Sequence, residues 1–241
     1  MRLDIFLVEN GLAESREKAK HVIRGGHVKI NGTTFAKPAK DVKEGDNVEL
    51  SGGFEYASRG GYKLGPAVEG WGINFAKKTV ADVGCSTGGF TDYAIKHGAK
   101  KVYSIDIGDD LHPSLRANKK VIYMPRLDAL TVDKLPEAID VCLIDVTFVP
   151  LGEVLAVVKD WMKSSGEVVA LIKPPFEREG GVKVVKADEE LRALAEKVAK
   201  EAAELYEVRG LVESGLEGKS AGQKEFFVCL KAIQIAEQES K

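Results

Sequence analysis

The stretch Asp82-Val83-Gly84-Cys85-Ser86-Thr87-Gly88-Gly89-Phe90 joins an apolar segment to the start of an amphipathic one. Glycines in such a connection let the backbone turn sharply and let a ligand approach the main-chain amides at a helix N-terminus. We therefore predict a strand that ends at Val83, a helix that begins at Phe90, and a ligand over the loop between them.

An acidic residue follows the next apolar segment. Asp106 lies 22 positions after Gly84, and a carboxylate there can accept hydrogen bonds from ribose hydroxyls. The loop has Gly-x-x-x-Gly-Gly spacing rather than the Gly-x-Gly-x-x-Gly of dinucleotide-binding loops, which favours an adenosyl amino acid over a pyrophosphate. Glycines at strand-to-helix turns also occur for packing alone, and that alternative stays open at this point.

Two further aspartates belong to the candidate cofactor site. Asp128 follows the third predicted strand and could meet an adenine edge, although it could as well cap its own loop. Asp145 ends an otherwise apolar strand and therefore points into the crevice where doubly wound sheets bind ligands. The complete set of candidate cofactor-binding residues is Gly84, Ser86, Thr87, Gly88, Gly89, Phe90, Asp106, Asp128 and Asp145.

The chain around this loop alternates between strand and helix patterns. The predicted strands are Thr79–Val83, Lys101–Ile105, Val121–Met124, Asp140–Asp145, Glu167–Ile172, Glu207–Val212 and Glu225–Lys231. The predicted helices are Phe90–Lys96, Glu153–Lys163 and Asp188–Glu204. Such alternation is typical of a mostly parallel sheet with helices on both faces, so the predicted fold class is Rossmann-like α/β.

The first fifty residues have a different character and predict a small α+β domain. Leu3, Phe6 and Leu7 share one face of a short helix that Gly11 stops. Ser15 is placed to cap a second helix, whose apolar row is Ala19, Val22 and Ile23. His27–Ile30 alternates like a strand, Asn31-Gly32 is a hairpin signal, and Val42, Val48 and Leu50 are expected to complete a small sheet.

A basic block within this segment suggests a nucleic-acid surface. Eight lysines and arginines lie between Arg16 and Lys43, against two acids. A solvated surface is the simpler alternative, but these charges share a helix side with a turn and a hairpin, which favours RNA binding. The candidate RNA-binding residues are Arg2, Ser15, Arg16, Lys18, Lys20, Arg24 and Lys29. Ser51-Gly52-Gly53 marks a linker, so the expected domains are 1–53, a linker and start of the catalytic domain at 54–64, and 65–241.

Composition restricts the class of protein. The 241 residues are 44% hydrophobic and 30% charged with a net charge of −2, so affinity for nucleic acid must come from a local patch. The three cysteines are far apart and no Cys/His pair has metal-ligand spacing, so we expect no disulfide framework and no metal. The N-terminus lacks the apolar core of a signal peptide and no run of about 18 apolar residues exists, so we expect a cytoplasmic protein.

These motifs together resemble a known family over nearly the whole chain. Arg2-Leu3-Asp4 and Gly11–Arg16 resemble the RNA-binding S4 domain of a ribosomal protein. The rest is similar to FtsJ-like ribose methyltransferases, so the chain resembles the TlyA (haemolysin A) family of ribosomal RNA 2′-O-methyltransferases. The matching blocks are Ser58–Leu64, Asp82–Thr91, Asp145–Phe148, Ile172–Glu177 and Gly222–Phe226. The resemblance implies a class I methyltransferase fold, S-adenosyl-L-methionine as cofactor, and cytidine ribose in ribosomal subunits as substrate.

The resemblance also implies a catalytic set. The Lys-Asp-Lys-Glu quartet of FtsJ-like enzymes corresponds to Lys63, Asp145, Lys173 and Glu225. A ribose hydroxyl is a poor nucleophile and needs a base, for which Lys173 is the candidate. Crowding by the Lys63 ammonium and desolvation would favour the neutral amine of Lys173, while the two carboxylates orient the lysines. No metal is needed, because a sulfonium is already an activated leaving group.

Other functions remain as alternatives. Loss of a quartet member would have favoured a non-enzymatic RNA-binding or ribosome-assembly protein, and all four are present. A membrane-lytic haemolysin would need an exported chain with a membrane segment, whereas the long amphipathic stretch Asp188–Glu204 has the pattern of a helix packed on a sheet. Base methylation would leave the paired lysines unexplained. The sequence therefore favours ribose methylation.

Overall fold

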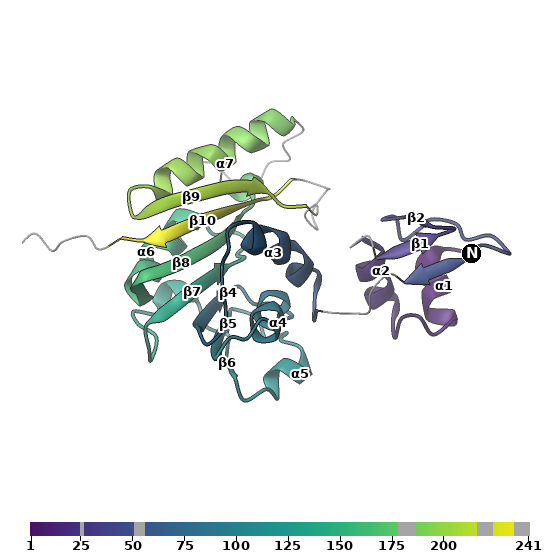
Figure 1. Ribbon diagram of the computed structural model, residues 1–241, viewed down its shortest axis with the longest axis horizontal. Coiled ribbons are helices and arrows are strands. Elements are labelled where there is room, and N and C mark those ends of the chain that lie inside the picture. Colours follow the sequence, from purple (N-terminus) through teal and green to yellow (C-terminus); the bar gives the residue numbers. More distant parts are fainter. Residues whose placement is uncertain (25–26, 51–55, 178–186, 216–223, 234–241) are drawn as a thin grey trace, which may run out of the picture. The chain divides into compact units, whose positions relative to one another are not determined.

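A computed structural model describes residues 1–24, 27–50, 56–177, 187–215 and 224–233. The chain divides into two compact units, Met1–Tyr62 and Lys63–Lys241, each of which is described here by itself (Figure 1). The expected linker at 51–53 lies outside the described residues. Among the described residues, no helix combines the length and the apolar character that crossing a bilayer requires.

The smaller unit contains two helices and a three-stranded antiparallel sheet. Helices α1 (Leu3–Glu9) and α2 (Arg16–Arg24) pack together, and the sheet has the order β2 (Thr33–Thr34), β1 (Val28–Ile30), β3 (Val48–Leu50). The hydroxyl of Ser15 accepts a hydrogen bond from the Lys18 amide at 3.3 Å, which is the predicted cap of α2.

The hairpin and the core of this unit follow the sequence with one exception. Asn31 and Gly32 have φ values of 52° and 80°, the left-handed pair that a two-residue hairpin turn requires. The predicted apolar rows are buried in one core. Val42 is also buried there but does not extend the sheet: its amide bonds to the Met1 carbonyl at 2.7 Å instead, beside an Arg2–Asp41 bridge.

The larger unit is built on a seven-stranded sheet, which confirms the predicted class. Its strands are β4 (Thr79–Val83), β5 (Lys101–Asp106), β6 (Val121–Pro125), β7 (Ile139–Ile144), β8 (Met162–Ile172), β9 (Tyr206–Glu213) and β10 (Phe226–Ala232). Their order is β6-β5-β4-β7-β8-β10-β9, in which β4 to β8 run parallel and β10 is antiparallel to both neighbours. The order reverses direction at β4, so the carboxyl ends of β4 and β7 flank a topological switch point.

Helices cover both faces of this sheet (Figure 1). Helices α6 (Leu151–Val158) and α7 (Asp188–Ala202) share one apolar cluster with alternate strand residues such as Val83, Ile144 and Ile172. On the other face, the Phe90 ring of α4 (Gly89–Lys96) lies 6.0 Å from the Phe227 ring of β10. The shorter elements are α5 (Pro113–Arg116) and three 3₁₀ turns, η1 (Ala129–Thr131), η2 (Lys159–Trp161) and η3 (Pro174–Phe176).

Helix α3 (Arg59–Gly70) is not predicted by the sequence analysis, which assigns its first half to a linker. Four glycines and Pro66 within the helix hide its pattern. Leu64, Ala67 and Val68 are nevertheless buried at helical spacing, and burial of that face outweighs poor intrinsic propensity. A side chain at Gly65 would press on the Tyr93 ring at 3.2 Å, so the glycine permits close packing of α3 on α4.

Candidate active site

The glycine-rich loop between β4 and α4 has the conformation its sequence predicts. Gly84 and Gly88 have φ values of 81° and 94°, which L side chains rarely adopt. A Cβ at Gly84 would lie 2.5 Å from the Asp145 carbonyl oxygen, and one at Gly88 would lie 2.4 Å from a Leu115 methyl. The amides of Gly84 and Cys85 bond to the Ile105 carbonyl at 2.9 and 3.2 Å, which fixes the loop at the end of β5.

Asp106, at the end of β5, stabilises the same loop through its carboxylate. Its carboxylate accepts hydrogen bonds from the amides of Ser86 and Gly108, both at 2.7 Å. Each oxygen keeps a further lone pair, so a role toward ribose hydroxyls stays a prediction. Asp128 caps η1 through the Leu130 amide at 2.9 Å, which is the loop-capping alternative, and its adenine contact stays a prediction as well.

The remaining loop residues have mainly backbone roles in this structure. Phe90 is buried against Phe227, the Thr87 carbonyl accepts a hydrogen bond from His112 at 3.3 Å, and Gly89 opens α4. A cofactor contact by any of these residues stays a prediction.

A buried acid lies beneath the loop. Asp82 is fully buried and accepts a hydrogen bond from the Thr91 hydroxyl at 2.6 Å, which in turn contacts the Ser104 hydroxyl at 2.8 Å. Burial, which penalises the charged carboxylate, is the main cause that raises the pKa of Asp82 to about 7. Sequence analysis placed Asp82 in the motif without recognising this polar core beneath the site.

The raised pKa of Asp82 gives a testable pH dependence. An unfolded aspartate has a pKa of about 3.9, so between roughly pH 4 and pH 7 the folded protein holds more protons than the unfolded chain. Stability should therefore fall as pH rises through this window, and the loss should be smaller in Asp82→Asn. Melting temperatures measured from pH 5 to pH 8 test this, and parallel curves for the two proteins would contradict it. Burial also raises the pKa of Glu177 to about 7, so the stability of the wild type and of Asp82→Asn should both keep part of the pH dependence.

The quartet residues lie at the carboxyl edge of the sheet. Asp145 directly follows β7 and Lys173 directly follows β8. Glu225 directly precedes β10, and it lies beside Lys173 because Phe226 is in register with Ile172. Lys63 reaches this edge from α3. The sheet therefore brings together residues that are up to 162 positions apart.

The quartet is organised as two ion pairs. Lys63 pairs with Glu225, and both side chains are buried. Lys173 Nζ lies 2.5 Å from Asp145 Oδ1 and donates a hydrogen bond to the Thr147 hydroxyl at 3.0 Å. Each lysine thus has its own carboxylate, and crowding of Lys173 by the Lys63 ammonium stays a prediction. Thr147, which sequence analysis missed although it lies in the block Asp145–Phe148, helps to orient the candidate base.

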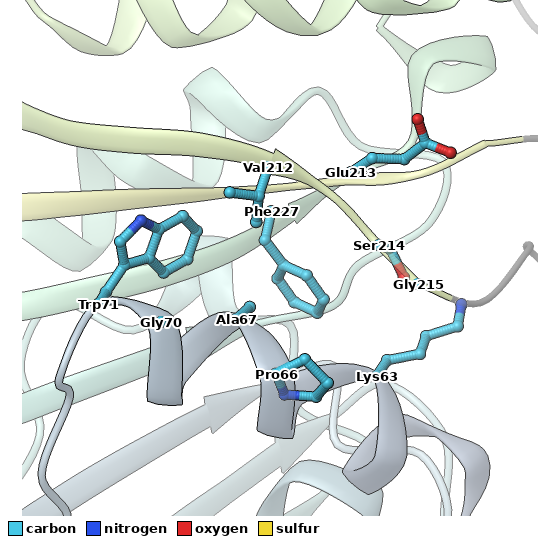
Figure 2. A pocket seen from close by; sticks show the side chains of 10 residues that line it. All are labelled: Lys63, Pro66, Ala67, Gly70, Trp71, Val212, Glu213, Ser214, Gly215 and Phe227. Carbon is cyan, nitrogen blue, oxygen red and sulfur yellow. The ribbon is translucent and has the colours of Figure 1, made fainter.

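A cavity of about 220 Å³ opens beside this edge. Figure 2 shows Pro66 and Ala67 of α3 facing Val212 and Phe227 of the β9–β10 hairpin, with Trp71 toward one end and Lys63 toward the other. The remaining lining residues are Gly70, Glu213, Ser214 and Gly215. The cavity combines apolar walls with a member of the quartet, so a substrate group placed there would lie next to Lys63.

An exposed aromatic side chain stands close to Asp145 in the sequence. Phe148 is 78% exposed, and its φ of 71° is rare for a bulky residue. Its ring meets the Phe176 ring edge-on, with centroids 5.2 Å apart. The loops that follow β7 and β8 therefore present an aromatic surface to solvent beside the quartet.

The candidate RNA-binding residues differ in the contacts that they make within the smaller unit. Arg2 and Arg16 both bind the buried carboxylate of Asp4, and these contacts lower the pKa of Asp4 to about 2. Lys18 pairs with Glu14 and Lys20 pairs with Glu17. Ser15 caps α2, Lys29 lies in β1, and the side chain of Arg24 is outside the described part of the structure. Two of the arginines therefore also stabilise the fold.

The fold and the loop define a class of protein. A switch-point sheet with one antiparallel strand inserted near its edge, and a glycine loop between its first strand and first helix, is the Rossmann-like fold of a class I methyltransferase. Residues 56–232 match the FtsJ-like methyltransferase family and residues 1–48 match the S4 domain. The chain belongs to the FtsJ-like methyltransferase family and carries an N-terminal S4 domain.

Relatives cover most of the chain. It is 35% identical to the 16S/23S rRNA (cytidine-2′-O)-methyltransferase TlyA of Mycobacterium tuberculosis, over 95% of this chain and 89% of that one. It is 36% identical to the putative rRNA methyltransferase YqxC of Bacillus subtilis, over 95% and 85%. Among solved structures, a putative hemolysin from Streptococcus thermophilus has a TM-score of 0.73 at 31% identity, covering 97% of this chain and 89% of that chain.

Proposed function

We propose that this protein transfers a methyl group from S-adenosyl-L-methionine to the ribose 2′-hydroxyl of a cytidine in ribosomal RNA. The observation that carries the proposal is the pair of lysine–carboxylate contacts at the carboxyl edge of the sheet, beside the glycine-rich loop. The name of the Mycobacterium tuberculosis relative supports both the substrate and the position of methylation.

The residues of the edge supply the acid–base chemistry. When bound, S-adenosylmethionine supplies a methyl group on an activated sulfonium. The Gly84–Gly89 loop and Asp106 would hold this cofactor, and Lys173 would act as the base that accepts the proton of the 2′-hydroxyl when the hydroxyl oxygen takes the methyl group. Asp145 and Thr147 hold Lys173 Nζ in place, and Asp145 stabilises the ammonium that results. Lys63 and Glu225 provide a fixed, buried ion pair at the substrate side of the site.

The smaller unit is proposed to bind the RNA backbone. Its S4-domain match and its basic residues on α2 and β1 support this role. Because Arg2 and Arg16 bind Asp4, and Lys18 and Lys20 pair with glutamates, Lys29 is the better reporter of phosphate contact.

Lys29→Ala should weaken binding to ribosomal RNA and reduce the slope of log affinity against log salt by about one. Lys197→Ala on α7 of the larger unit, which removes an exposed lysine, is the control and should leave the slope unchanged. Filter binding at several salt concentrations measures both. Equal slopes for wild type and the Lys29 variant would remove Lys29 from the interface.

Transfer of labelled methyl from S-adenosylmethionine to ribosomal subunits lacking the modification tests the activity itself. Mapping of the product should find a 2′-O-methylated cytidine. Label in protein or in a base, or no transfer by the wild-type protein, would overturn the proposed function.

A further inference from the structure

The N-terminus of α6 is capped by a residue from a different loop. Four amides at the start of a helix lack partners within it, and a preceding Ser, Thr, Asp or Asn usually supplies an acceptor. Here the cap position is Pro150, which makes no side-chain cap bond. The Leu151 amide instead donates to both carboxylate oxygens of Glu177, each at 3.2 Å. Glu177 lies 26 positions later, directly after η3.

The two segments that this contact joins are the ones that carry the candidate base and its partners. Asp145 and Thr147 lie just before α6, and Lys173 lies just before η3. Lys173 already spans the two segments through its contacts with Asp145 at 2.5 Å and Thr147 at 3.0 Å. The rings of Phe148 and Phe176 also meet, with centroids 5.2 Å apart. Along each of the two segments, the phenylalanine lies between the residue that contacts Lys173 or is Lys173 and the residue of the Glu177 cap.

We propose that Glu177 is a positioning residue for methyl transfer, which holds the β7–α6 loop against the β8–η3 loop and so keeps Lys173 aligned with Asp145 and Thr147. This inference rests on the function proposed above. Glu177 does not touch the quartet directly; its effect passes through the Leu151 amide and the short segment 145–150.

A glutamate suits this role for a physical reason. The partial positive charge of a helix N-terminus favours a carboxylate, and an acceptor fixed on a neighbouring loop restrains both segments. Burial raises the pKa of Glu177 to about 7, with Glu201 of α7 as the charged group that adds to the rise. Glutamine, which keeps an acceptor oxygen of the same reach, is therefore a close substitute.

The size of the effect follows from the geometry required for reaction. Loss of a helix cap lowers stability only modestly, which a domain of this size tolerates. Misplacement of reacting groups by about 1 Å can cost roughly 100-fold in rate. Glu177→Ala should therefore lower kcat about 10- to 100-fold, leave KM for S-adenosylmethionine within about twofold, and lower Tm by only about 3 °C.

The decisive comparison uses the full-length protein, three variants and ribosomal subunits. Glu177→Ala should lose kcat, and Glu177→Gln should recover most of it. Glu153→Ala, which removes an exposed carboxylate from the first turn of the same helix, controls for charge at the helix N-terminus and should behave as wild type. Equal kcat for wild type and Glu177→Ala would overturn the inference. So would a loss in Glu177→Ala that Glu177→Gln shares fully, since an acceptor oxygen is then not what matters.

A second measurement keeps this inference separate from the function it rests on. Hydrogen exchange of the Leu151 amide should be slow in wild type and in Glu177→Gln, and faster in Glu177→Ala. If the wild-type protein transfers no methyl to ribosomal RNA but the exchange pattern holds, the proposed function fails, while the contact between Glu177 and the Leu151 amide is supported. Fast exchange of the Leu151 amide in the wild type would contradict a stable contact with Glu177 and so overturn the inference.

Discussion

Replacing Lys173 with alanine is expected to reduce methyl transfer about 1000-fold, because positioned general bases contribute roughly 10²–10⁴-fold. Lys173 is the quartet lysine that forms an ion pair with Asp145 and a hydrogen bond with Thr147. It follows β8, which lies next to β7 in the sheet. Affinity for S-adenosylmethionine should change little, since the loop and Asp106 are untouched. Single-turnover transfer to ribosomal subunits, together with calorimetry of cofactor binding, measures the two quantities separately.

Two further variants decide what Lys173 does. Lys173→Arg keeps a cation but cannot accept a proton near neutral pH, so it should be nearly as inactive as the alanine variant. Lys163→Ala removes a lysine at the other end of β8, where it pairs with Asp140 at 2.9 Å, and should leave activity unchanged. An active arginine variant would mean that Lys173 acts by its charge alone, and an active alanine variant would exclude it as the base.

Gly84→Ala is expected to have the second large effect, on both stability and cofactor binding. The left-handed backbone at Gly84 and a Cβ only 2.5 Å from the Asp145 carbonyl oxygen mean that the backbone itself must shift. Strain of this kind costs about 1–3 kcal/mol, and overpacking costs a similar amount. We expect a loss of about 3 kcal/mol or more, which for a domain of this size is a fall in Tm of roughly 10 °C.

The same shift should move Asp145 away from Lys173, so methyl transfer should fall along with stability. Gly152→Ala is the matched control: a side chain there meets nothing within 4 Å, and alanine favours the helix α6. Thermal unfolding of both variants gives the comparison. A Gly84→Ala protein as stable and active as wild type would show that the close approach of the loop to β7 is not required.

The glycine loop, the alternation of strands with helices and the hairpin could be predicted because local sequence patterns determine them. Asn31-Gly32 and Gly84 need backbone conformations that few other residues adopt. Helix α3 could not be predicted, because Pro66 and four glycines conceal a helix that tertiary packing stabilises. The pairing of Lys63 with Glu225 and of Lys173 with Asp145 also lay beyond the sequence, since it depends on strand register across the sheet.

Contacts made by isolated side chains were the hardest to predict. Asp128 caps its own turn, which is one of the two roles that its position after a strand allowed, and its adenine contact stays a prediction. Arg16 belongs to a basic helix side, yet it stabilises the buried Asp4. Glu177 ends the matching block Ile172–Glu177, but its acceptor role could not be predicted because it depends on a distant helix whose cap position is Pro150.

The three cysteines allow the rate at which the larger unit opens to be measured by thiol labelling. Cys85, Cys142 and Cys229 are all buried, and burial raises the pKa of each thiol, that of Cys229 to about 11. Reactive thiolate is therefore scarce until the structure opens. A thiol reagent should thus label the protein at the rate at which its sheet opens, with no signal from the smaller unit, which contains no cysteine. If S-adenosylmethionine binds over the loop as proposed, adding it should slow the labelling of Cys85 more than that of Cys142 or Cys229.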